Sequence, residues 1–159
     1  MKIRKAAPSD ASHFAKWLSD PLIHPYCIVE PGKEAEFLAH TWSEPAAYAT
    51  SFVALRGGRP VGLAFVSGTP YHKASHWNAL TLIVDPKEWG KGIGTALLSE
   101  AETWARTAKI ERFVIELFES PAQPWFERRG FMPFSSGPSA LKIGETFRMS
   151  TKLKKEWIC

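Results

Sequence analysis

The sequence has little cysteine, and this scarcity excludes two classes of protein. Cys27 and Cys159 are the two cysteines in 159 residues, and they lie far apart in the chain. Neither belongs to a CxxC or Cys/His spacing, so the chain has no disulfide framework and no zinc-site pattern. We therefore expect no metal, and we expect a reducing cytoplasm as the location of the protein.

Long apolar runs and blocks of one charge are also missing. The N-terminal residues MKIRKAAPSD contain no apolar signal core, and the longest apolar runs are too short to span a bilayer, so export and membrane anchoring are not predicted. The net charge of +4 comes from scattered basic residues. Without a Lys/Arg-rich block or a recognisable motif, nucleic-acid binding is not predicted, whereas an anionic small ligand suits a mildly basic surface.

Length and patterning indicate one α/β domain over residues 1–159. Hydrophobic residues make up 45% of the chain, which is ordinary for a folded protein. Strands are expected at residues 2–6, 51–55, 60–66, 76–84, 113–118 and 146–153. Helices are expected at 11–18, after Pro31-Gly32, at 92–108 and at 121–129. The 92–108 helix is the most secure of these, because Ile93, Leu97, Ala101, Trp104 and Ala108 recur at helical spacing.

The informative motif is the glycine-rich segment between the 76–84 strand and the 92–108 helix. Its sequence, from Trp89 to Thr95, is WGKGIGT. Glycines let the backbone approach a ligand closely, and the unsatisfied N–H groups of a helix N-terminus favour an anion. The segment does not fit the Rossmann pattern GxGxxG or the P-loop pattern. We therefore expect it to bind a phosphate group of a different nucleotide-like ligand.

Three segments resemble the GNAT superfamily of acyl-CoA N-acyltransferases. They are WGKGIG at 89–94, LIVDP at 82–86 and WFERRGF at 125–131. The expected order of strands and helices is also similar to that family. The resemblance implies the GNAT fold, in which a mixed, mostly antiparallel seven-strand sheet is flanked by helices. It also implies acetyl-CoA as co-substrate.

The resemblance assigns cofactor contacts to three parts of the chain. They are the end of the 76–84 strand beside the pantetheine arm, the glycine segment around the pyrophosphate, and the 120–126 region beside the thioester. The residues concerned are Leu82, Ile83, Val84, Trp89, Gly90, Lys91, Gly92, Ile93, Gly94, Thr95, Ser120, Ala122, Trp125 and Phe126.

Three positions depart from the family pattern and leave the catalytic residues open. Trp89 stands where Gln or Arg is usual, and Phe126 stands where many members have a proton-donating Tyr. Ala79 stands where related members have a Glu that acts as the general base. The candidates to replace the missing groups are Thr81, Asn78, His76 and Glu30. For His76, strand alternation predicts a hydrogen-bonded structural side chain on the Leu80/Leu82 face rather than a base.

The tryptophans are divided between core and pocket. Trp17, Trp42 and Trp104 are predicted to lie in the core, and Trp77 and Trp125 are the better candidates for an acceptor pocket.

The expected activity is transfer of an acetyl group from acetyl-CoA to a primary amine on a small metabolite, an antibiotic or a protein. The alternative is a non-catalytic acyl-CoA-binding module that lacks the usual acid and base. The oligomeric state is open, with a homodimer among the possibilities.

Overall fold

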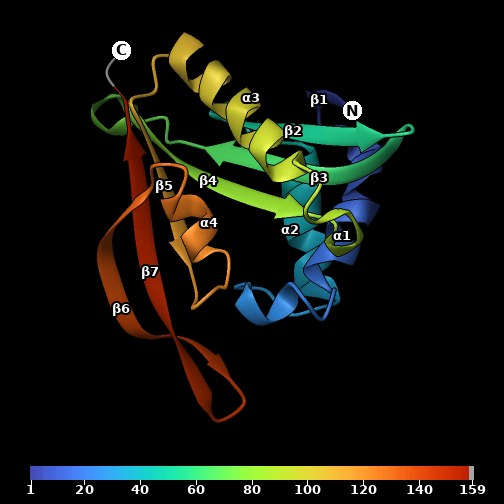
Figure 1. Ribbon diagram of the computed structural model, residues 1–159, viewed down its shortest axis with the longest axis vertical. Helices are drawn as coiled ribbons and strands as arrows, with labels where there is room; N and C mark the ends of the chain where they lie inside the picture. The colour runs from blue at the N-terminus through green and yellow to red at the C-terminus, as the bar shows by residue number, and fades with distance from the viewer. Residues whose placement is uncertain (158–159) are drawn as a thin grey trace.

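The computed structural model describes residues 1–157 of the chain, so the predicted lack of a disulfide partner for Cys159 lies outside the described residues. One seven-stranded sheet, in the order β1-β2-β3-β4-β5-β7-β6, organises these residues (Figure 1). The strands are β1 (Lys2–Lys5), β2 (Ala49–Arg56), β3 (Arg59–Ser67), β4 (Trp77–Val84), β5 (Arg112–Leu117), β6 (Met132–Ile143) and β7 (Thr146–Glu156). All neighbouring pairs are antiparallel except β4 and β5, which are parallel. The predicted mixed, mostly antiparallel sheet is confirmed.

Helices cover both faces of the sheet. The α-helices are α1 (Ala11–Leu18), α2 (Lys33–Ser43), α3 (Ile93–Thr107) and α4 (Gln123–Glu127). Four single 3-10 turns, η1 (Pro8–Asp10), η2 (His24–Tyr26), η3 (His72–Ala74) and η4 (Pro86–Glu88), connect them to the strands. Helix α3 crosses one face, and α1 and α2 lie on the other (Figure 1).

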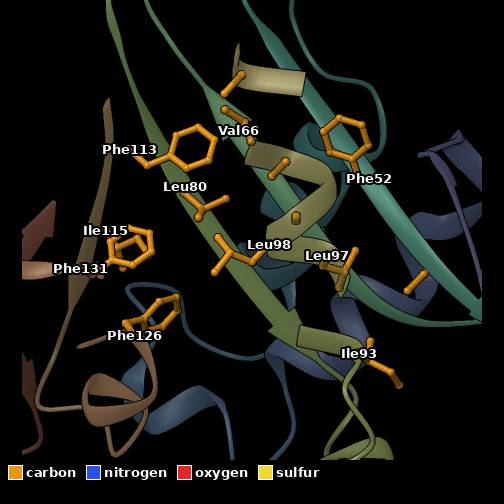
Figure 2. Packing of buried hydrophobic residues seen from close by; sticks show 14 of the residues in the cluster. Phe52, Val66, Leu80, Ile93, Leu97, Leu98, Phe113, Ile115, Phe126 and Phe131 are labelled. Atoms are coloured by element: carbon orange, nitrogen blue, oxygen red, sulfur yellow. The ribbon is translucent and has the colours of Figure 1, made fainter. Parts of the chain in front are cut away.

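The two faces carry two separate hydrophobic clusters. On the α3 face, Leu97, Ala101 and Ala105 of the helix are fully buried in one cluster with sheet residues, Phe126 and Phe131. Figure 2 shows the larger side chains of this cluster. The three buried helix residues recur every four positions, in agreement with the apolar helical spacing from which the sequence predicted this helix.

On the other face, the second cluster includes Trp17 and Trp42, which are buried as predicted. Trp104 is half-buried at the edge of the first cluster, where its ring meets Phe52 edge to face at 6.3 Å.

The C-terminal strands form a long hairpin that extends beyond the rest of the sheet (Figure 1). The sequence pattern placed the last strand at 146–153, but β7 continues to Glu156 because its final residues still pair with β5, as in the Phe113–Lys155 pair. Strong alternation is missing there because both sides of the strand carry lysines.

Among residues 1–157, no helix is long and apolar enough to cross a membrane. The single-domain organisation, the cytoplasmic location and the oligomeric state stay predictions.

Strands β4 and β5 separate after a short paired stretch, and this gap positions the site. They pair only from Trp77 to Ala79 on β4 and from Arg112 to Val114 on β5. Beyond that point β4 remains paired with β3, and β5 remains paired with β7. The inner edges of Leu80–Val84 and Ile115–Leu117 therefore face each other without pairing. Unpaired strand edges carry N–H and C=O groups that can bond to an extended ligand.

Candidate functional site

The glycine segment forms an open turn at the end of β4. Gly90 and Gly92 have φ angles of 78° and 80°, which residues with a side chain rarely adopt, and a Cβ built on either would meet nothing within 4 Å. Within the described residues, the backbone N–H groups of 90–95 donate to no other backbone carbonyl, and the first helical bond runs from the Ala96 N–H to the Gly92 carbonyl. A row of free N–H groups thus faces open space at the N-terminus of α3, which suits an anion.

An ion-pair network connects the residues just before this turn to β2 and β3. The Asp85 carboxylate accepts hydrogen bonds from the Lys87 N–H at 3.0 Å and from Arg59 at 3.2 Å. Burial raises the pKa of Asp85, but these bonds and the Arg59 charge outweigh it and hold the pKa below its ordinary value. The Glu88 carboxylate accepts from Arg56, Arg59 and Lys91. Lys91 therefore points back toward Glu88 and lies outside the cavity described below.

Two large side chains, Trp89 and Arg129, lie beside the glycine segment. Trp89 binds to the backbone of β4, and Arg129 supplies a positive charge near the segment. The Trp89 indole N–H donates to the Val84 carbonyl at 2.8 Å, so it closes the end of β4. Arg129, which follows α4, stacks on the Trp125 ring at 3.7 Å and donates to the Thr95 hydroxyl at 3.0 Å. It also donates to the Trp125 carbonyl at 3.0 Å. Arg129 thus places a fixed positive charge near the N-terminus of α3.

A cavity of about 910 Å³ passes through the gap between β4 and β5. Its wall contains residues of both hydrophobic clusters, which lie on opposite faces of the sheet, so the cavity joins the two faces. It contains all but one of the residues that the sequence assigned to the cofactor: Leu82, Ile83, Val84, Trp89, Gly90, Gly92, Ile93, Gly94, Thr95, Ser120, Ala122, Trp125 and Phe126. Lys91 is the exception. A cavity of this size is typical of small-molecule sites.

The four candidate catalytic residues are not brought together. Thr81 lines the cavity, on the same face of β4 as Ile83. Asn78 is buried where β4 and β5 are still paired, with its amide against Gly68. Glu30 is exposed, and its backbone N–H donates to the Glu34 carboxylate at 2.8 Å.

His76 is also exposed, so the predicted structural role on the Leu80/Leu82 face is wrong. The alternation does not reach it, because β4 begins at Trp77. His76 joins the neighbouring segment through its backbone carbonyl, which accepts from the Glu111 N–H at 2.7 Å. Of the two tryptophans expected at a pocket, Trp125 lines the cavity, whereas Trp77 is 37% exposed and lies outside its wall.

Glu116 of β5 is an exposed acidic residue of the cavity wall that the sequence reasoning missed. Phe113 and Ile115 point into the cluster on the α3 face, so alternation directs Glu116 to the α1/α2 face, where it lines the cavity. Its carboxylate accepts a hydrogen bond of 2.6 Å from the hydroxyl of Ser150, a buried residue of β7. The available signal was a lone charge inside the apolar run FVIELF at 113–118.

Two further wall residues are chemically restricted. Burial raises the pKa of the Cys27 thiol to about 11, so the thiol stays protonated at neutral pH and is a poor nucleophile. Phe126 is 5% exposed and packs edge to face against Trp125 and Phe131, with ring centroids 4.9 and 5.5 Å apart. It therefore belongs to the core as well as to the cavity wall, and it carries no proton to donate.

The sequence matches the model of the Acetyltransferase (GNAT) family over residues 12–131. The match covers most of the chain and includes α1 to α4, the glycine segment and the first residues after α4. The chain therefore belongs to the GNAT acetyltransferase family, as the sequence motifs predicted. No curated protein sequence matches the chain.

Solved structures share the fold over nearly the whole chain. A ribosomal-protein-alanine N-acetyltransferase from Brucella melitensis is 19% identical with a TM-score of 0.76, covering 99% of this chain and 100% of that one. The structure of yncA from Salmonella typhimurium with its cofactor acetyl-CoA is 17% identical with a TM-score of 0.82 and coverages of 98% and 93%. A phosphinothricin acetyltransferase from Sinorhizobium meliloti in complex with acetyl-CoA is 18% identical with a TM-score of 0.80 and coverages of 98% and 87%. At these identities the likeness concerns the fold.

Proposed function

We propose that this chain transfers an acetyl group from acetyl-CoA to a primary amine, and that Glu116 accepts a proton from that amine. The observation that carries the proposal is the continuous cavity, which leads from the glycine segment on the α3 face to the Glu116 carboxylate on the α1/α2 face. An acyl donor and an amine can therefore approach from opposite faces of the sheet and meet in the gap between β4 and β5. Such positioning supplies a large part of the rate of a two-substrate reaction.

The residues of the α3 face fit acetyl-CoA. The free N–H groups of residues 90–95 suit a pyrophosphate, and Arg129 adds a cation beside them. The unpaired edges of β4 and β5 suit the amide groups of an extended pantetheine arm. Two of the structural neighbours were determined with acetyl-CoA, which supports the same ligand for this chain.

The α1/α2 face supplies the proton acceptor. Acetyl-CoA provides a thioester carbonyl carbon, to which the amine nitrogen forms a C–N bond as the C–S bond breaks. A primary amine enters as an ammonium ion and loses two protons in becoming an amide. Glu116 accepts one and passes it to solvent, and the other is matched by protonation of the departing thiolate from solvent, because Phe126 has no proton to give.

The acyl group passes directly between the two substrates. A covalent acyl-cysteine would need the Cys27 thiolate, but the raised pKa of about 11 keeps this thiol protonated at neutral pH. Its sulfur lies 3.5 Å from the Ile23 carbonyl oxygen, to which the thiol donates.

Release of free thiol from acetyl-CoA, measured against a broad panel of primary amines, tests the proposal. For the best acceptor, Glu116→Gln should lower kcat by about 100-fold to 10,000-fold while the affinity for acetyl-CoA, measured by calorimetry, stays unchanged. Glu119→Gln is the matched control, because Glu119 is a nearby carboxylate outside the cavity wall whose Oε1 accepts from the Met149 N–H. An unchanged kcat in Glu116→Gln would exclude Glu116 as the base.

The non-catalytic acyl-CoA-binding module is the second candidate. Phe126 and Ala79, which replace the usual acid and base, favour it. Acetyl-CoA binding without thiol release for any amine in the panel would support this module and overturn the proposed enzyme. A thermal-shift assay in which NAD or ATP stabilises the protein and acetyl-CoA does not would overturn both candidates.

A further inference from the structure

We infer that the acceptor is a primary amine on an apolar, preferably aromatic, carbon skeleton that carries no carboxylate or phosphate group. The inference rests on the proposed function and names its acceptor class. It comes from the α1/α2 half of the cavity, which we define as the wall residues contributed by α1, α2, the loop that contains η2, and the α1/α2-facing side chains of β3, β4 and β5.

The wall of the α1/α2 half is predominantly apolar. The loop contributes Ile23 and Tyr26, helix α2 contributes Leu38 and Trp42, and strand β3 contributes Phe65. The Trp42 and Phe65 rings lie 6.1 Å apart and make a tilted aromatic pair. Apolar atoms of an acceptor gain free energy by leaving water for such a wall, and aromatic rings gain further from ring contacts.

The entrance is apolar as well. Leu22 and Ile28 line the cavity, yet they are 58% and 69% exposed. Exposed large apolar side chains at the edge of a cavity mark a surface that binds an apolar partner. An aliphatic or aromatic group can therefore remain in contact with apolar residues from the entrance to the interior.

Glu116 is the one charged residue that the described part of the chain places in this half of the wall. The other two charged wall residues, Glu88 and Arg129, belong to the glycine segment and to α4 on the α3 side. A single carboxylate matches a single ammonium group. An acceptor with its own carboxylate or phosphate would bring a second negative charge into an apolar wall without a cation, which is strongly unfavourable.

Two cations of β7 lie near this half without lining it: Lys152 is the cross-strand neighbour of Glu116, and Arg148 lies against Tyr26. Its guanidinium stacks on the Tyr26 ring at 4.8 Å and reaches the Glu119 carboxylate at 4.0 Å, and it does not line the cavity. Tyr26 is a wall residue, whereas Arg148 is not. An acceptor carboxylate held by Arg148 would give the opposite result in the test.

Matched pairs of amines provide the test, with kcat/KM measured by thiol release at saturating acetyl-CoA. Phenethylamine should exceed phenylalanine, and tyramine should exceed tyrosine, by at least about 100-fold, because each pair differs only by the carboxylate. Along the linear alkylamines from propylamine to hexylamine, kcat/KM should rise by roughly fourfold for each methylene group that enters the wall. Putrescine, whose second ammonium has no partner, should be a poorer acceptor than pentylamine.

A variant should weaken the preference for the amine without a carboxylate if the inference is right. Ser67 ends β3 and lines the cavity, so Ser67→Lys adds a cation to the wall without removing an apolar side chain. The phenylalanine-to-phenethylamine ratio of kcat/KM should rise by about tenfold or more. Ser75→Lys adds the same charge at an exposed residue outside the cavity and should leave the ratio unchanged. Calorimetry with acetyl-CoA confirms that each variant is folded.

Three results overturn the inference. Preference for phenylalanine over phenethylamine, abolished by Arg148→Ala, would mean that the acceptor carries a carboxylate. Turnover confined to peptides would mean a polypeptide acceptor. In both cases the proposed acetyl transfer stands. Acetyl-CoA binding without turnover of any amine would overturn the proposed function, and the acceptor class with it.

Discussion

Arg129 should contribute affinity specifically for the phosphate groups of acetyl-CoA. It lines the cavity, and its hydrogen-bond partners, the Thr95 hydroxyl and the Trp125 carbonyl, are neutral. Burial and the neighbouring Arg128 charge lower the pKa of Arg129, as expected for a cation without an anionic partner among residues 1–157. The Trp125 ring holds the guanidinium in place at 3.7 Å, so little side-chain entropy is lost when a phosphate binds.

The magnitude follows from one charge-assisted hydrogen bond. Such a bond contributes about 1.5–3 kcal/mol, so Arg129→Ala should raise the Kd of acetyl-CoA by about 10- to 150-fold. Arg129→Lys keeps the charge but loses the planar guanidinium and its stacking. Its Kd for acetyl-CoA should therefore lie between those of the wild type and Arg129→Ala. The loss should shrink as the salt concentration rises, because salt screens a partly exposed charge. Calorimetry gives the Kd directly.

A truncated ligand separates charge from packing. S-Acetylpantetheine has no phosphate, so its affinity should be the same in wild type and in Arg129→Ala. Arg128→Ala, which removes the adjacent exposed arginine, should leave the acetyl-CoA affinity nearly unchanged. Adding Trp89→Arg to Arg129→Ala should restore part of the affinity by returning a cation to the glycine segment. The reasoning is refuted if Arg129→Ala weakens both ligands equally, because Arg129 would then act by supporting Trp125.

Three further predictions concern the glycine segment, the core and pH. Gly92→Val should abolish measurable acetyl-CoA binding and lower the free energy of unfolding by only about 1–2 kcal/mol, because the new side chain enters open space at a φ of 80°. Phe126→Ala should lower the free energy of unfolding by about 3–5 kcal/mol, because this ring is buried in the core. Asp10→Asn should destabilise the protein at pH 7, and its difference from wild type should narrow as the pH falls through the pKa of Asp10. Burial raises that pKa, but hydrogen bonds from Arg4 and the Ala7 N–H, with the Arg4 charge, outweigh it and lower it overall, so the stabilisation is present above the unfolded pKa of about 4 and is lost below it.

Each of these has a matched control. Urea unfolding at several pH values compares Asp10→Asn with Glu36→Gln, which changes an exposed carboxylate of α2. Phe126→Leu should destabilise less than Phe126→Ala, and a loss below about 1 kcal/mol in the alanine variant would contradict its place in the core. Gly94→Val should act through displacement of the Trp125 ring, because a Cβ on Gly94 would lie 3.2 Å from it, whereas a Cβ on Gly92 would meet nothing within 4 Å. If Gly92→Val binds acetyl-CoA normally, the phosphate lies elsewhere.

The surroundings of Gly94 correct the explanation that the motif alone gives for this glycine. From the sequence, each glycine of WGKGIG is predicted to leave room for the pyrophosphate. In the structure, Gly90 and Gly92 border open space, whereas Gly94 leaves room for the Trp125 ring of α4. A local pattern cannot distinguish a glycine required by a ligand from one required by a side chain about thirty residues away in the chain, because only tertiary packing brings the two together.

The catalytic candidates show the same limit. Strand periodicity correctly placed Thr81 on a strand and Leu82 to Val84 near its end, because side-chain alternation is a local property. It could not show that β4 and β5 separate after Ala79 and Val114, since a parallel pair is joined through a long intervening helix. Without that separation, Glu116 reads as a charge on an ordinary strand, and His76 and Glu30 look as suitable as any other titratable residue.

By itself, the sequence determined the family, the order of the helices and of every strand except β6, and the segment suited to a phosphate. These depend on short-range features, namely hydrophobic periodicity, glycine positions and two motifs within about fifty residues of each other. The tertiary structure alone decided that the cavity passes through the sheet and that Lys91 turns toward Glu88 while Arg129 faces the cavity. It also decided that the exposed Glu116 lines the same cavity as apolar residues of α1, α2 and β3. These depend on contacts between residues distant in the chain, which the packing of both sheet faces establishes together.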